Sequence, residues 1–195
     1  MYLVLPHLLT ILQFILVIMA WARPGKASMV LGSLLVGLGC LYLTGFLLTS
    51  PWVLSVKALL YFIVGAVQVS YVAMALMNRV DLWRIASLSQ PLMLPFLLLA
   101  NYLPAISGGP AFMVEPTSLQ WHVVSATLAY ALLSLAAFFA FAIITRQAYL
   151  KAHPRSAFVT GLPYLEVLEK AQTSTLQLTL LVLLVSVVAG SFFTH

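Results

Sequence analysis

The chain has 195 residues, of which 63% are hydrophobic and only 7% are charged, and its mean hydropathy is +1.10. Soluble domains are about 45–50% apolar and about 25% charged, so this composition excludes a water-soluble fold and indicates a protein that lies in lipid. The net charge of +5 does not indicate a nucleic-acid partner, because the cations lie in short segments between apolar runs and form no basic face.

Six apolar runs follow one another along the chain, each long enough for the roughly 20 helical residues that cross a bilayer. They predict an all-α membrane bundle, with one transmembrane domain over residues 1–195. The first run begins at once, without a basic segment or a small-residue cleavage site, so we expect a span there and no cleaved signal peptide. The predicted spans are 3–21, 27–48, 53–77, 85–103, 122–145 and 171–193.

A charged connector is expected between the fifth and sixth spans, over residues 146–170. Its second half, 157–170, alternates apolar residues with Glu and Lys in a helical period. Two interpretations fit this pattern. The segment is either a short helix that lies on the membrane surface or an extension of the sixth span.

The nine Lys and Arg residues predict the orientation of the bundle. Eight of them lie after the first, third and fifth spans, and only Lys57 lies on the other side. Because cytoplasmic loops are rich in Lys and Arg, both termini are expected to face outside, in the periplasm or its equivalent. All four Trp residues lie at predicted span ends, as is typical of the aromatic belt of a membrane protein.

Few residues in the predicted spans could carry chemistry. No predicted span contains an acid, which argues against a buried proton relay, and no activated nucleophile or paired acid and base is recognisable. An enzyme is therefore not expected, whereas a transporter remains an alternative because two prolines interrupt the fourth span. The single cysteine, Cys40, excludes a disulfide framework and is expected to be a packing residue. Five polar residues are expected to hydrogen-bond between helices, namely Gln13, Gln68, Gln90, Asn101 and Gln177.

Two histidines are candidate metal ligands. His7 lies one turn into the first span and His122 opens the fifth, and the predicted topology places both near the outer face. Imidazole is a common ligand of haem iron, so His122 and His7 could bind one haem, and Lys57 could meet a haem propionate. The simpler interpretation is that the histidines hydrogen-bond locally and that Lys57 extends to the headgroups. His153 and His195 are expected to be solvated.

A spaced set of residues extends from Trp121 to Gly190. A His opens the fifth span, a Tyr and a pair of small residues follow, the connector carries a Pro-x-Leu-x3-Glu element, and a Gly ends the sixth span. These residues are His122, Tyr130, Ala136, Ala137, Pro163, Leu165, Glu169 and Gly190. The pattern resembles the cytochrome c assembly family of haem-handling membrane proteins, and within it the short HemX-like branch. The sequence lacks the tryptophan-rich WWD motif of the larger members and the spans that follow the sixth in relatives.

The resemblance implies haem handling or cytochrome maturation by a multi-pass accessory protein of the bacterial inner (plasma) membrane. The outer-face histidine of the family corresponds to His122, while the second such histidine of relatives lies in the spans that this sequence lacks. The alternative is a non-catalytic structural subunit of a larger respiratory or photosynthetic membrane complex. Both functions imply a membrane-protein partner or a larger complex, in addition to the surrounding lipids.

Overall fold

The computed structural model describes residues 4–22, 25–49, 56–77, 82–103, 118–152 and 162–191. Six of its helices are long and apolar enough to cross a membrane, which confirms the predicted all-α membrane bundle. The elements in chain order are α1 (Val4–Trp21), α2 (Lys26–Thr49), α3 (Val56–Met77), the 3-10 helix η1 (Leu82–Ile85), α4 (Ala86–Tyr102), α5 (Ser118–Ala152) and α7 (Leu165–Ser191).

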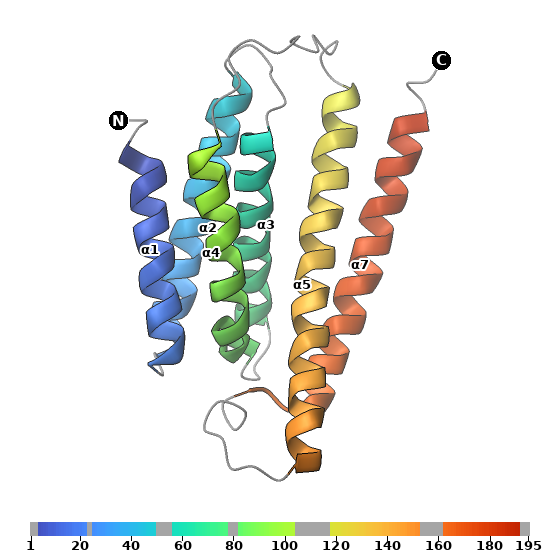
Figure 1. Cartoon of the computed structure of the whole chain (residues 1–195). Helices are drawn as coiled ribbons and strands as arrows, with labels where there is room; N and C mark the ends of the chain where they lie inside the picture. Colours follow the sequence, from blue (N-terminus) through green and yellow to red (C-terminus); the bar gives the residue numbers. More distant parts are fainter. Residues whose placement is uncertain are drawn as a thin grey trace.

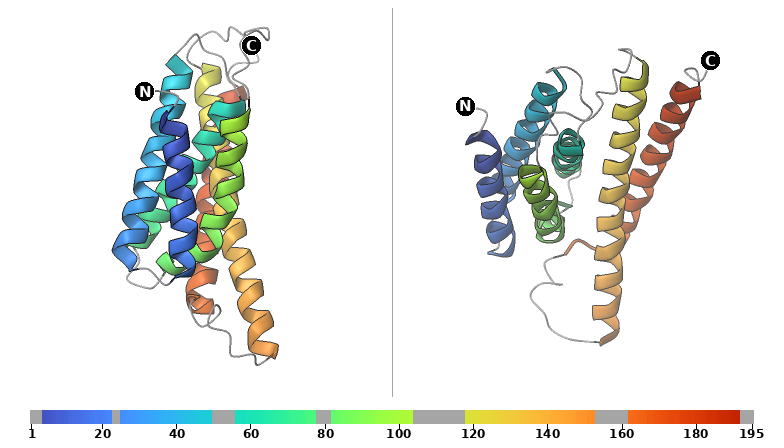
Figure 2. Two further views of the ribbon diagram at one scale, coloured as in Figure 1. Left: turned by 60° about the vertical axis from the view of Figure 1, so that its left-hand side comes forward. Right: turned by 45° about the horizontal axis from the view of Figure 1, so that its top comes forward.

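The helices run alternately up and down, so that α1 begins and α7 ends at the same end of the bundle (Figure 1). We call this the upper end, after its place in Figure 1, and the opposite end the lower end. Which end faces the periplasm stays a prediction. Both in Figure 1 and in the two views of Figure 2, α1–α4 form one group, α5 packs beside α3, and α7 lies on the outside of α5.

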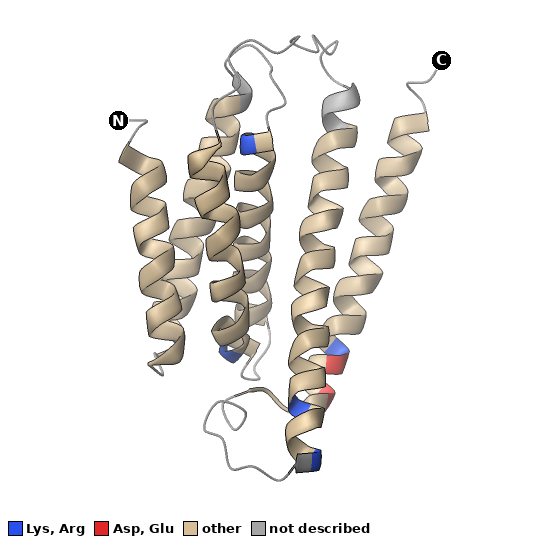
Figure 3. Cartoon of the chain, in the orientation of Figure 1, with Lys and Arg blue, Asp and Glu red and all other residues tan. Residues whose placement is uncertain are grey.

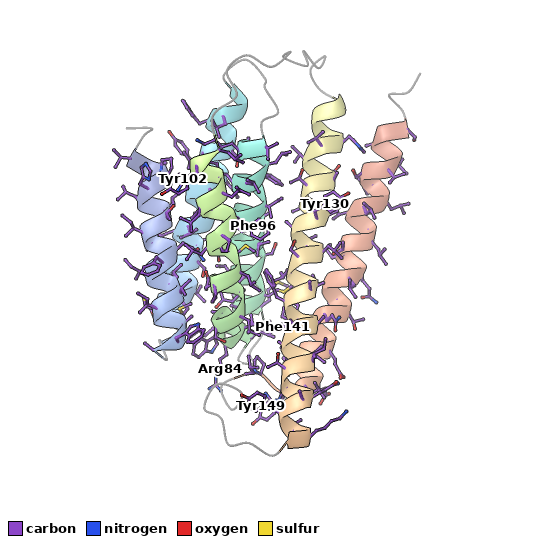
Figure 4. All side chains as sticks on the ribbon, in the orientation of Figure 1. Arg84, Phe96, Tyr102, Tyr130, Phe141 and Tyr149 are labelled. Carbon is purple, nitrogen blue, oxygen red and sulfur yellow. The ribbon has the colours of Figure 1, made fainter. Side chains whose placement is uncertain are left out.

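The burial of the helices follows from this arrangement. In α3 and α5, 56% of the most apolar stretch is buried, whereas in α1 and α7 the fraction is 17%. Helix α3 is therefore central, and α1 and α7 are the two edges of the molecule. Their many exposed Leu, Ile and Val side chains need lipid around them, as do the outward-pointing Phe96, Tyr130 and Phe141 in Figure 4.

Most of the described charged residues lie at the lower end (Figure 3). Among the described residues only Lys57, at the start of α3, is a cation at the upper end. The described cations at the lower end are Lys26, Arg84, Arg146, Lys151 and Lys170. The one-sided distribution expected from the sequence is thus present in the folded chain, for the residues that the structure describes.

The first four predicted spans agree with α1–α4 to within a few residues, but the predicted connector over 146–170 is too long. Helix α5 continues to Ala152 and α7 begins at Leu165. Residues 146–152 contain no Pro or Gly, so their helix propensity carries α5 beyond the lipid. With 35 residues, α5 is about 50 Å long, compared with about 30 Å of hydrocarbon. Leu165–Lys170 thus extends the sixth span, as the second interpretation has it, while residues 157–161 lie outside the described residues.

Helices α2 and α3 approach each other closely at two glycines. A Cβ atom on Gly37 would lie 3.0 Å from Val69 Cγ2 and 3.1 Å from Gln68 Cβ, and one on Gly65 would lie 2.9 Å from Leu41 side-chain atoms. Small residues allow such close packing in lipid, where no hydrophobic effect drives helices together. This contact holds Gln68 in the centre of the bundle.

Candidate functional site

His122 lies near the upper end of α5, where its imidazole ring contacts α7. The ring Nδ1 is 2.8 Å from the main-chain oxygen of Ser186 and 3.3 Å from its Oγ. The Ser186 hydroxyl in turn donates a hydrogen bond of 3.1 Å to the main-chain oxygen of His122. Ser186 is 1% exposed, so this reciprocal pair is a built contact between the two helices.

Gly190 makes room for the imidazole of His122. A Cβ atom at this position would lie 2.8 Å from Nδ1 and 2.9 Å from Cε1, closer than a real Cβ approaches another atom. Gly190 follows Ser186 by one helical turn, so both lie on the side of α7 that faces α5. A side chain at 190 would overlap with the ring, so the glycine is needed for the ring to lie where it bonds to Ser186.

The carbonyl partner determines which ring nitrogen of His122 carries hydrogen. A carbonyl oxygen only accepts, so at 2.8 Å the Nδ1–H donates to Ser186. In the neutral ring the lone pair then lies on Nε2, and within the described part of the chain no group hydrogen-bonds to that atom. Metal-binding histidines commonly have this arrangement, with the second nitrogen donating to a carbonyl or carboxylate.

The structure does not bring His7 to His122. His7 is exposed near the upper end of α1, and α1 and α5 stand on opposite sides of the group formed by α2, α3 and α4 (Figures 1 and 2). The two histidines share an end of the bundle, as the topology predicted, but α1 and α5 are not neighbours. One chain therefore does not place these two imidazoles on the same haem.

Lys57 is half-buried in the first turn of α3, at the upper end and on the helix next to α5. It shares this end of the bundle with His122. Among the described residues, no group of three His, Cys, Asp or Glu side chains could hold a metal ion. His153 and His195 lie outside the described residues. The candidate site consequently rests on His122, with Lys57 as the nearest described cation along the upper end.

A second polar cluster lies in the middle of α1–α4 and joins all four helices. It consists of Gln13, Ser33, Gln68 and Gln90, none of which is more than 1% exposed. Gln13 Nε2 donates to the main-chain oxygen and to Oε1 of Gln90, each at 2.9 Å. Gln68 Nε2 donates to Gln13 Oε1 at 2.9 Å and to Gln90 Oε1 at 2.8 Å. Gln90 Nε2 donates to Ser33 Oγ at 3.0 Å and to Gln68 Oε1 at 3.2 Å.

Every amide N–H of these three glutamines thus has an acceptor inside the cluster, which we call the glutamine cluster. In lipid, where no water can satisfy a stray donor, such a closed set stabilises one arrangement of the helices. Asn101 acts similarly closer to the upper end, where it accepts from Tyr61 and donates to Thr10 and to the Pro6 carbonyl. The expected hydrogen bonds between helices are confirmed for Gln13, Gln68, Gln90 and Asn101.

Gln177 is different. Its side chain is exposed on α7, and no hydrogen bond to it is found in the ranges that the structure describes. The sequence expectation therefore does not hold for this residue within a single chain.

At the lower end, Arg146 holds the chain entering α7 against α5. Its guanidinium donates to the main-chain oxygens of Leu162 and Pro163, and its Cζ lies 5.4 Å from the centre of the Tyr164 ring. A planar guanidinium suits two neighbouring acceptors and an aromatic face at once. The arginine thereby fixes the position of Pro163, the first residue of the Pro-x-Leu-x3-Glu element.

Comparison of the chain with family models, curated proteins and solved structures finds no match. Functional conclusions for this protein consequently depend on the geometry of its own residues.

The sequence alone pointed to His122 and to Gly190, but not to their contact, and Ser186 was missed. The available signal was the spacing of four residues between Ser186 and Gly190. It places a hydroxyl group and a position without a side chain on the same face of the helix. The spacing does not predict which helix, or which residue of that helix, packs against Gly190.

Proposed function

We propose that this protein handles haem during the maturation of c-type cytochromes, and that His122 is a haem ligand. The observation that carries the proposal is the fixed imidazole: Nδ1 is engaged by the Ser186 carbonyl, and Nε2 keeps its lone pair. The resemblance to haem-handling proteins supports it further, since two residues of that pattern, His122 and Gly190, are in contact. We place the protein in the bacterial inner membrane, with the upper end in the periplasm.

Among the described residues, His122 and Lys57 are the ones that would hold haem. His122 would bind the iron through Nε2, and Lys57, on the neighbouring helix, would neutralise a propionate. Bound haem would supply a redox-active iron at the membrane surface. Because α1 stands on the far side of the bundle from α5, His7 would not hold the same haem as His122. We expect a single ligand to suit a protein that passes haem on, since fewer bonds need to be broken at transfer.

The test is haem binding by the full chain in mild detergent, followed by visible absorption of the oxidised and reduced forms. The wild type is expected to show a Soret band that saturates as haem is added, and His122→Gly is expected to lose most of it. Added imidazole should restore the band in His122→Gly, because the free ligand replaces the missing ring. His7→Ala is the matched control and should bind as the wild type does. Equal spectra for His122→Gly and the wild type would reject the assignment.

A second candidate function is a non-catalytic subunit of a larger membrane complex. The observation that favours it is the closed glutamine cluster, whose donors are all occupied within α1–α4 and so offer nothing to a ligand. Co-migration with a larger complex after extraction in mild detergent, combined with no haem absorption, would favour this function. Recovery of the protein with bound haem and without other subunits would reject it.

A further inference from the structure

Helix α7 buries one side against the rest of the molecule and exposes the other. The residues that face inward are Leu168, Ala171, Thr175, Thr179 and Ser186. Most other residues of α7 are exposed, and those directly opposite the inward face follow one another at spacings of three and four. They are Ser174, Gln177, Leu181, Leu184 and Val188, and we call them the α7 outer stripe. An alternation of three and four is the spacing of a seam between two helices that pack at a small angle.

Gln177 carries a long polar side chain on this exposed stripe, which is unfavourable in lipid unless a partner covers it. It lies seven residues beyond Lys170, or about 10 Å along the helix axis from the charged lower end. Its side chain is shorter than that of a lysine and does not reach back to the charged end. If the sixth span begins at residue 171, as the sequence predicts, an exposed carboxamide at this depth faces hydrocarbon, where an unpaired N–H or C=O is costly. Gln13, Gln68 and Gln90 avoid this cost because they bond to each other.

We propose that the α7 outer stripe is the surface through which two copies of this chain associate, with Gln177 of one copy hydrogen-bonded to Gln177 of the other. A carboxamide carries both donor and acceptor, so it is complementary to itself. Two copies related by an axis along the membrane normal place the same residue at the same depth. A second copy therefore satisfies Gln177 without any further condition, and Leu181, Leu184 and Val188 form the apolar part of the contact.

Helix α1 is the comparison for this surface, because it is the other exposed edge of the molecule. It is as little buried as α7, yet its outer face in the membrane consists of Leu8, Ile11, Phe14, Ile15 and Ile18. No long polar side chain interrupts it between His7 and Trp21, apart from the buried Gln13. Helices α1 and α7 are thus equally exposed, but only α7 exposes a carboxamide in its span, that of Gln177. Helix α1 is therefore the matched control surface.

Cysteine cross-linking in native membranes tests the proposal with the full chain. The single native cysteine is buried and is first removed as Cys40→Ala. In this background, Leu181→Cys and Leu184→Cys on the stripe are expected to give a covalent dimer, at about twice the 21.3 kDa mass of the chain, on mild oxidation. Val185→Cys, exposed on α7 but beside the stripe, and Phe14→Cys on α1 are the controls and should remain monomeric.

The role of Gln177 is tested by the dissociation constant of the dimer, measured by energy transfer between labelled copies in detergent micelles. Gln177→Leu should raise the constant about three- to thirtyfold, whereas Gln177→Asn, which keeps the carboxamide, should largely preserve it. Neither variant removes a hydrogen bond between the described residues, so the thermal stability of the monomer should change little.

Three results would overturn the proposal: an unchanged dissociation constant in Gln177→Leu, equal cross-linking at Phe14→Cys and Leu184→Cys, or cross-linking only to a protein of another mass. None of these depends on haem, so the outcome is independent of the proposed function.

Discussion

The imidazole of His122 lies where a Cβ atom on Gly190 would have to be, 2.8 Å from Nδ1. Gly190→Ala is therefore expected to displace the ring, break its bond to Ser186 and destabilise the protein by about 1–3 kcal/mol. Thermal unfolding in detergent, followed by tryptophan fluorescence, measures this.

Gly45→Ala is the matched control for this experiment, because nothing lies within 4 Å of a Cβ atom at that helical position. Alanine is the better helix former, so this variant should be neutral or more stable by up to about 1 kcal/mol. Equal stabilities of the two variants would show that the ring and Gly190 are not in close contact.

Replacing Gln90 by Leu is expected to lower the free energy of unfolding by more than the change in side-chain volume suggests. The side chain of Gln90 accepts hydrogen bonds from Gln13 and Gln68 and donates to Gln68 and Ser33, so its loss leaves a buried donor unpaired on each of the other two glutamines. We expect a loss of about 1–3 kcal/mol in the free energy of unfolding, measured by equilibrium denaturation in mixed micelles.

Replacing all three glutamines by Leu should then cost less than the sum of the three single changes, because no glutamine amide is left without a partner. A strictly additive triple variant would mean that the three amides do not form one closed cluster.

Arg146→Lys keeps the charge but cannot reproduce a planar guanidinium that donates to two carbonyls. The first turn of α7 should open more readily, and hydrogen exchange of its amides should become about tenfold faster or more. Exchange rates that are unchanged from the wild type would show that Arg146 does not hold this segment in place.

The predicted orientation can be tested with single cysteines in the Cys40→Ala background. Lys57→Cys should react with a membrane-impermeant thiol reagent added to intact cells, while Lys151→Cys should react only after the membrane is opened. The reverse pattern would place the charged lower end outside.

Much of the fold could be predicted because lipid imposes it. Backbone groups in hydrocarbon must pair within a helix, so each long apolar run becomes a helix, and charges move to the ends. The ends of α5 and α7 were harder to predict. Hydropathy detects the lipid boundary, whereas the helix continues past it for as long as good helix formers such as Gln147, Ala148 and Leu150 follow.

The candidate site was predictable in its residues and not in its contacts. His122 stands out as a histidine at a span end, but Ser186, which fixes the ring, is 64 residues away along the chain. Similarly, Gln68 and Gln177 are the same residue in equally apolar helices, yet one is buried and the other exposed. Which helices are neighbours decides these outcomes, and the periodicity of a single span does not contain that information.

The glutamine cluster also has a consequence for biogenesis. All its members, and the Tyr61–Asn101–Thr10 contacts beside it, lie within the first 101 residues. A ribosome synthesises these four helices before α5 and α7, and N-terminal parts of a chain generally fold first during synthesis. The first four spans can therefore form the hydrogen bonds between them early. Helix α3 is then in place when α5 and α7 are added, and α5 can pack against it. For the glutamine cluster, every hydrogen-bond partner is thus made before α5 and α7, whereas His122 meets Ser186 only after α7 has been made.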